Sequence, residues 1–89
     1  MEYEVKWTET SLRQLEKLGK DAGKPVAKRI FDKVESITGD PFKFVKRLRG
    51  FDLYRLRVGD YRVIMSIERS KLVILILEVG HRKVIYSRL

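Results

Sequence analysis

The stretch RVGDYR, residues 57–62, places two arginines on either side of a Gly-Asp pair and decides how the second half of the chain folds. Gly59 followed by Asp60 suits a two-residue hairpin loop, because glycine accepts the positive φ of a type II′ turn. With that loop, Arg57 lies opposite Arg62. Like charges that face each other across a sheet destabilise the pair by up to ~1 kcal/mol. The predicted hairpin therefore contains an unfavourable pair that a bound anion would relieve.

Strand alternation sorts the side chains of this hairpin onto two faces. The apolar residues share one face, which we interpret as the core side: Tyr54, Leu56, Val58, Tyr61, Val63 and Met65. Arg55, Arg57 and Arg62 share the other face. Arginine binds phosphate through two parallel hydrogen bonds and stays charged at any working pH, so we expect these residues to hold phosphate. The alternative is that they extend into water or meet Glu68 or Glu78.

The rest of the second half also reads as strands. Alternation and turn residues predict strands over 52–58, 61–67 and 71–79, joined by tight turns. The run LVILIL, 72–77, is apolar on both faces, which is typical of a central strand. We expect the tail, 80–89, to add a further strand or a terminal turn.

The first half has a different pattern. Alternation over 2–7 predicts a half-buried strand, and Thr8 offers the N-cap of a helix that ends near Gly19. Pro25 suits the first turn of a second helix, and the short polar link predicts an antiparallel pair. The whole pattern predicts one α+β domain over 1–89, with an N-terminal strand, two antiparallel helices on one side of the sheet, and a three- to four-stranded antiparallel sheet.

Composition limits the classes of function. The chain has 20 lysines and arginines against 12 acidic residues, a net charge of +8. This field points to a polyanionic partner, although charge can also serve solubility alone. No cysteine and a single histidine argue against a disulfide scaffold and a metal site, so we expect no metal and no cofactor. Without a leader or a membrane-length apolar run, we expect a cytoplasmic protein with no membrane partner.

Two further clusters combine basic and aromatic residues. The segment FKFVKRLRGF, 42–51, contributes Lys43, Lys46, Arg47 and Arg49, and the tail contributes His81, Arg82, Lys83, Tyr86 and Arg88. Such mixtures suit nucleic acids, where rings stack on bases and cations meet phosphates. We nevertheless expect Phe42 and Phe44 to belong to the core, because large apolar side chains are usually buried.

Together these segments resemble a known family. The run KRLRGFDLYRLRVGDYRVIMSI, 46–67, followed by LVILILEVGHRKVIY, 72–86, resembles the RelE/ParE superfamily of toxins from bacterial and archaeal toxin–antitoxin pairs, in particular its RelE branch. The resemblance covers most of the chain, and its specific parts lie at 48–50, 54–62 and 80–86. It implies the RelE-like fold and an mRNA interferase that enters the ribosomal A site and cuts mRNA there. The cut uses the neighbouring 2′-hydroxyl as nucleophile and needs no metal.

The resemblance also implies partners and residue roles. A RelB-type antitoxin neutralises the toxin, and operator DNA is bound only through the antitoxin complex. Arg62 and Arg82 match arginines that stabilise the transition-state phosphate, and Tyr86 matches a tyrosine of proton transfer. The residues expected to bind RNA are Arg49, Arg55, Arg57, Lys46, Arg47 and Lys83.

The chemistry of the residues is compatible with these roles. Fixed guanidinium groups stabilise the extra negative charge of a phosphodiester transition state. A free tyrosine titrates near ~10 and is a poor base unless nearby cations lower its pKa. His81 has a more suitable ordinary pKa, near ~6.5, so Tyr86 and His81 are both candidates for the acid–base role. Because arginine is a poor proton donor, Arg55 and Arg57 are expected to bind rather than react.

Two other functions remain open at this point. A ParE-type inhibitor of DNA gyrase shares the fold without the RNA-cutting residues, and a basic RNA-binding module would bind without cleaving. The positive surface separately suggests a neutralising partner that is acidic, partly disordered when free, and folds over the arginines.

Overall fold

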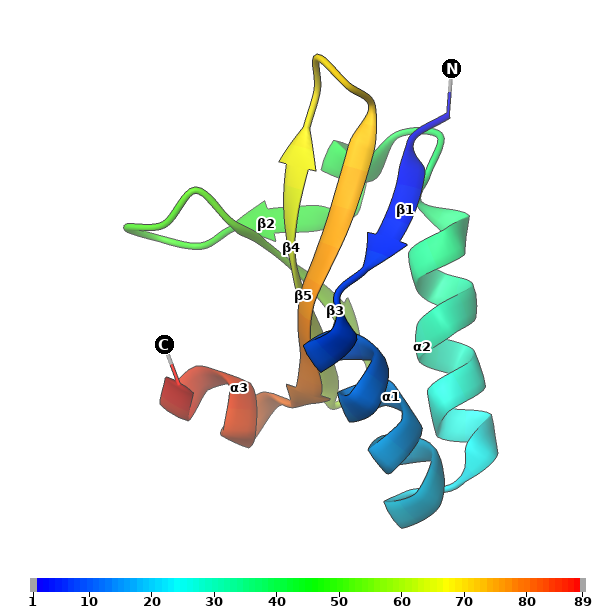
Figure 1. Cartoon of the computed structure of the whole chain (residues 1–89). Coiled ribbons are helices and arrows are strands. Elements are labelled where there is room, and N and C mark those ends of the chain that lie inside the picture. Colours follow the sequence, from blue (N-terminus) through cyan, green and yellow to red (C-terminus); the bar gives the residue numbers. More distant parts are fainter. Residues whose placement is uncertain (1, 89) are drawn as a thin grey trace.

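The computed structural model describes residues 2–88. Figure 1 shows the course of the chain. The elements are β1 (Glu4–Trp7), α1 (Glu9–Asp21), α2 (Lys24–Ser36), the 3₁₀ turn η1 (Pro41–Lys43), β2 (Val45–Arg47), β3 (Tyr54–Val58), β4 (Tyr61–Glu68), β5 (Val73–His81) and α3 (Arg82–Arg88). In this part of the chain, no helix is both long and apolar enough to cross a membrane.

The strands form one mixed sheet in the order β1-β5-β4-β3-β2. β1 runs parallel to β5, and the other neighbours are antiparallel. The α+β class and the order of its elements are confirmed, and residues 73–77 of the run LVILIL lie in β5, an interior strand. The antiparallel part of the sheet has four strands, β5-β4-β3-β2, within the predicted three to four, and β1 adds a parallel strand at one edge.

The helices begin where capping residues predict. The Thr8 side chain accepts a hydrogen bond from the Ser11 backbone N–H at 3.1 Å, which satisfies a free donor of the first turn of α1. α1 continues past Gly19 to Asp21, so the predicted end was two residues short. α2 has Pro25 in its first turn, as predicted.

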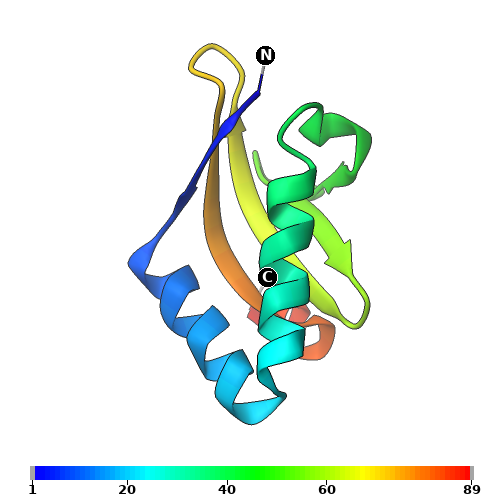
Figure 2. The ribbon, with the colours of Figure 1, turned by 90° about the vertical axis from the view of Figure 1, so that its right-hand side faces the viewer.

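α1 and α2 cover one face of the sheet. Figure 2 shows α2 in front of the curved strands β4 and β5, with α3 behind them. The buried residues between the helix pair and the sheet are Ile30, Val34, Ile37, Leu56, Val58, Val63, Met65, Ile74, Ile76 and Val79. The face of the hairpin that the sequence assigned to the core is therefore the core face.

The predicted helix pair, α1 and α2, lies on one side of the sheet as expected. The tail was expected to form a strand or a terminal turn, but beyond β5 it forms a third helix, α3, which lies on the opposite face of the sheet. Ile85 packs with Leu48 and Ile64 in a second small apolar cluster. It sits over Gly80, where an added Cβ would lie 3.2 Å from its Cδ1 atom. Because Gly80 has no side chain, Ile85 can pack against its backbone, and this contact holds α3 on the sheet.

The edge of β5 changes partner along its length. β1 pairs with β5 only as far as Ile76. Beyond Ile76, α1 lies beside β5 in place of β1, and the Gln14 side-chain oxygen accepts a hydrogen bond from the Val79 backbone N–H at 2.8 Å. A side chain thereby replaces the missing strand neighbour.

Candidate functional site

The β3–β4 hairpin has the register that the sequence predicted. Arg57 pairs with Arg62, Arg55 pairs with Ile64, and the turn residue Gly59 has a φ of +59°. Alternation therefore places Arg55, Arg57 and Arg62 on the side away from the main core. We call this side of the sheet the arginine face.

Arg62 is held almost completely inside the protein, with 8% of its surface exposed. Its Nη1 donates to the backbone oxygens of Gly59 at 2.8 Å and Tyr61 at 2.9 Å, and its Nε donates to the Tyr86 hydroxyl at 3.1 Å. None of these acceptors is a carboxylate, and no ion pair neutralises Arg62 within residues 2–88. The guanidinium is fixed in place and its charge remains available to an anion.

Tyr86 comes from α3 and meets both arginines. Its hydroxyl oxygen accepts hydrogen bonds from Arg55 Nη1 at 2.5 Å and from Arg62 Nε at 3.1 Å. Partial burial alone would raise the pKa of Tyr86, but the hydrogen bonds and positive charges of Arg62 and Arg55 outweigh it and lower the pKa below its ordinary value. Because the Tyr86 side chain is also 40% exposed, an incoming substrate can reach it.

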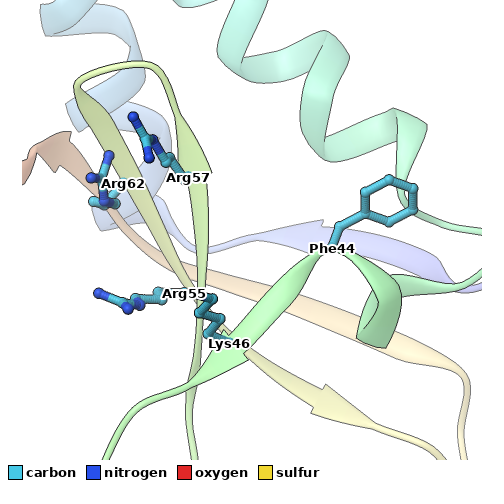
Figure 3. Close-up of a pocket in the computed structure, with 5 residues that line it drawn as sticks. All are labelled: Phe44, Lys46, Arg55, Arg57 and Arg62. Atoms are coloured by element: carbon cyan, nitrogen blue, oxygen red, sulfur yellow. The ribbon is translucent and has the colours of Figure 1, made fainter.

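A pocket of about 160 Å³ opens on the arginine face. Its lining residues are Phe44, Lys46, Arg55, Arg57 and Arg62. In Figure 3, Arg57 and Arg62 lie together at the hairpin, Arg55 and Lys46 lie side by side, and Phe44 stands apart from them. Four cationic side chains around one small cavity suit a phosphate group.

Phe44 is a correction to the sequence prediction, which placed it in the core. It is 46% exposed, and the ammonium of Lys33 lies 5.1 Å from its ring centroid. Phe42 is half-buried, with its ring edge-on to Tyr3 and Tyr54. The tight turn η1 explains the difference, because residues two apart in such a turn point in different directions.

His81 is not brought to the arginines. It pairs with Tyr61 across β4 and β5, whereas its neighbour Gly80 pairs with Arg62, so the His81 side chain lies on the face opposite Arg62. Its ring packs edge-on to Tyr61 at 5.7 Å, and its Nδ1 accepts the Lys83 backbone N–H at 3.2 Å.

The other basic residues lie around this centre. The Arg82 backbone N–H donates to the Asp60 oxygen at 2.9 Å, which ties the start of α3 to the hairpin turn. The side chains of Arg82, Lys83 and Arg49 are exposed, and Arg47 forms an exposed ion pair with Asp52 at 3.4 Å. The loop between β2 and β3, which carries Arg49, projects on the same side as α3 in Figure 1.

Sequence reasoning missed three features of the site. The backbone oxygens of Gly59 and Tyr61 fix Arg62, Ile85 holds α3, and the guanidinium of Arg29 lies against Gly59 where a side chain would otherwise be. Only Ile85 had a sequence signal, as an apolar residue in a basic tail. No cluster of three or more His, Asp and Glu side chains within residues 2–88 is arranged to hold a metal ion.

Fold and site together define a class: a small basic α+β protein with an arginine-lined anion site beside a tyrosine. A family model described as the ParE toxin of the type II toxin–antitoxin system parDE matches residues 5–86. A search of curated proteins found no significant match.

Solved structures give the same result. RelE in the archaeal RelE–RelB complex from Pyrococcus horikoshii is 35% identical, with a TM-score of 0.74 over 92% of this chain and 97% of that chain. The RelBE2 toxin–antitoxin complex from Mycobacterium tuberculosis contains a chain that is 28% identical, with a TM-score of 0.74 over 92% of this chain and 100% of that chain. The YoeB/ParE toxin from Agrobacterium tumefaciens, 17% identical, shares the fold with a TM-score of 0.72 over 89% of this chain and 98% of that chain.

The chain belongs to the RelE/ParE superfamily of toxins from type II toxin–antitoxin systems. The resemblance seen in the sequence is thereby confirmed.

Proposed function

We propose that this toxin is an endoribonuclease that cleaves mRNA in the ribosomal A site and so inhibits translation in the cytoplasm. The observation that carries the proposal is the Tyr86 oxygen, which accepts hydrogen bonds from Arg55 and Arg62 beside the cationic pocket. A base of lowered pKa next to fixed cations supports cleavage of a phosphodiester by its neighbouring 2′-hydroxyl.

In the proposed reaction, Tyr86 in its phenolate form takes the proton of the 2′-hydroxyl. The 2′-oxygen attacks the adjacent phosphorus and forms a 2′,3′-cyclic phosphate, while the bond from phosphorus to the 5′-oxygen breaks. The proton returns to the 5′-oxygen, which leaves as a hydroxyl. Arg62 stabilises the negative charge that develops on the non-bridging phosphate oxygens with its Nη2 group, because its Nε and Nη1 groups are held by Tyr86 and the hairpin turn.

The other residues take supporting roles in this proposal. Arg82 is the second stabilising arginine, supported by the attachment of its backbone to the hairpin turn. The residues proposed to bind RNA are Arg49, Arg55, Arg57, Lys46, Arg47 and Lys83. Proton transfer is given to Tyr86 rather than His81, because the His81 side chain is on the opposite face of the sheet.

We also propose a RelB-like antitoxin as the partner that neutralises this toxin, with operator DNA bound only through their complex. The Pyrococcus horikoshii and Mycobacterium tuberculosis structures are toxin–antitoxin complexes, which supports such a partner. The net charge of +8 favours an acidic antitoxin segment that covers the arginine face.

The test is cleavage on ribosomes programmed with a defined mRNA, mapped by primer extension, for the wild type, Arg62→Ala and a matched control. Arg13→Ala is that control, because it removes the same charge from an exposed position on α1, where Arg13 pairs with Glu9. We expect cleavage at the A-site codon by the wild type and Arg13→Ala, and its loss in Arg62→Ala. Absence of wild-type cleavage would refute the proposal.

Inhibition of DNA gyrase is the second candidate, favoured by the match to the ParE family model. A supercoiling assay with purified gyrase separates the two functions. Inhibition of supercoiling without cleavage of ribosome-bound mRNA would establish the gyrase function instead.

A further inference from the structure

We propose that the pocket on the arginine face is a subsite for a single nucleotide of the RNA, with the phosphate held by the arginines and the base stacked on Phe44. This inference rests on the proposed RNA substrate. It adds the residue that holds the base, which the arginines and Tyr86 do not explain.

The lining of the pocket is chemically uneven. Its cationic side chains gather at one end and Phe44 stands at the other, as Figure 3 shows. A nucleotide has the matching form, because its phosphate is anionic and its base is flat and polarisable. Base–aromatic stacking beside a basic groove is the usual way in which single-stranded nucleic acid is held.

Phe44 also lies close to the arginines along the chain path. β2 begins at Val45, which pairs with Leu56, so Phe44 comes directly before the paired residues of β2 and Arg57 directly after those of β3. Phe44 is the C-cap of η1 and has helical backbone angles, so its ring does not follow the alternation of β2. Phe44 and Arg57 therefore adjoin the same end of the β2–β3 pairing, and both line the pocket.

The ring of Phe44 is exposed. A phenylalanine that is 46% exposed gains little from the core, and the Lys33 ammonium lies 5.1 Å from its ring centroid. That cation lies at the end of the pocket where the base is proposed to stack. A protein partner that bound here through apolar side chains would contact one apolar residue, Phe44, among four cationic ones. A nucleotide, which has an anionic phosphate and a flat base, matches this lining better.

The experiment measures binding of the full chain to two fluorescein-labelled RNA hexamers by anisotropy. One hexamer carries all its bases and the other is abasic, and both are methylated at the 2′-oxygens so that no attack can occur. The variant is Phe44→Leu, which keeps an apolar side chain but removes the ring. The control is Phe51→Leu, because Phe51 is equally exposed at 45% but does not line the pocket.

We expect Phe44→Leu to bind the complete hexamer about tenfold more weakly than wild type, the size of a lost base–aromatic stack. Binding of the abasic hexamer should be unchanged, and so should the salt dependence, because no phosphate contact is removed. Phe51→Leu should behave as wild type. Thermal unfolding of both variants verifies that they are folded.

The outcomes distinguish this inference from the proposed function. If Phe44→Leu and Phe51→Leu bind both hexamers equally well while the wild type cleaves ribosome-bound mRNA, the base subsite is wrong and the nuclease stands. If Phe44→Leu weakens only the binding of the antitoxin, Phe44 belongs to a protein interface and the inference is also wrong. If the wild type neither binds the hexamers nor cleaves mRNA, both proposals fail.

Discussion

The two faces of the β3–β4 hairpin are built from the same strands but follow opposite rules. On the core face, Leu56, Val63 and Met65 are buried among apolar residues of α1, α2 and β5. On the arginine face, Arg62 is buried nearly as well but has no carboxylate partner within the described chain. Burial therefore serves two purposes here: it stabilises the fold on one face and fixes a charge for function on the other.

Substituting Arg62 should have the largest effect, and it separates the role of burial in stability from its role in fixing a charge. Arg62→Met keeps an extended apolar side chain and removes the charge, so the cleavage rate should fall about a thousandfold, the effect of losing one fixed transition-state donor. The free energy of unfolding should change by only about 1 kcal/mol, because a costly buried charge is lost together with its hydrogen bonds. Urea unfolding and ribosome cleavage measure the two quantities.

Met65→Ala is the matched change on the core face, and it should show the reverse pattern. Met65 is fully buried, so its truncation should lower the free energy of unfolding by roughly 2–5 kcal/mol. Cleavage per folded molecule should stay near wild type. A loss of activity in folded Met65→Ala, or severe unfolding of Arg62→Met, would contradict the division between the faces.

A smaller effect is expected at the apolar contact that holds α3 on the arginine face. Ile85→Ala removes the side chain that seats α3 over Gly80, so Tyr86 should no longer be held between Arg55 and Arg62. We expect cleavage to fall about a hundredfold, the lower end of what positioned proton transfer contributes. Amide hydrogen exchange should increase in α3 and not in α2. Unchanged protection of α3 would show that Ile85 does not hold it.

The smallest expected effect is a shift in pH dependence. Tyr86 acts as a base when deprotonated, and the arginines lower its pKa, so the cleavage rate should rise with pH toward that lowered pKa. Arg55→Ala removes one hydrogen bond and one charge, so the pKa of Tyr86 should move up and the rising limb of the pH–rate profile should move to higher pH. Ultraviolet titration of the phenol, compared with Tyr86→Phe, provides an independent measurement. A profile that is unchanged in Arg55→Ala would argue against Tyr86 as the base.

Local sequence rules predicted the β3–β4 hairpin but could not predict α3, the helix that packs on its arginine face. The register of Arg57 with Arg62 follows from the turn preference of Gly59 and Asp60, and the start of α1 follows from Thr8. The seven-residue helix α3 packs on Gly80 and on Leu48 and Ile64, and the last two are distant in sequence, so the tail alone carries no reliable helix signal.

The same limit explains the errors at the site. Phe44 looked like a core residue because hydrophobicity ignores direction, and only the geometry of η1 turns its ring outward. Ordinary pKa values favoured a histidine over a tyrosine as the base, whereas the family resemblance favoured Tyr86, so the sequence left both residues as candidates. The pairing of β4 with β5 separates them, because it puts Gly80 rather than His81 on the face of Arg62.

The hydrogen bond from Val79 to Gln14 has a consequence for the behaviour of this protein at high concentration. An unpaired strand edge is a template onto which another chain can add, and this is a common start of aggregation. Where β1 ends, Gln14 occupies the Val79 N–H and α1 lies along the remaining edge of β5. The helix that covers the core also closes this edge, which protects the apolar centre of the sheet from self-association.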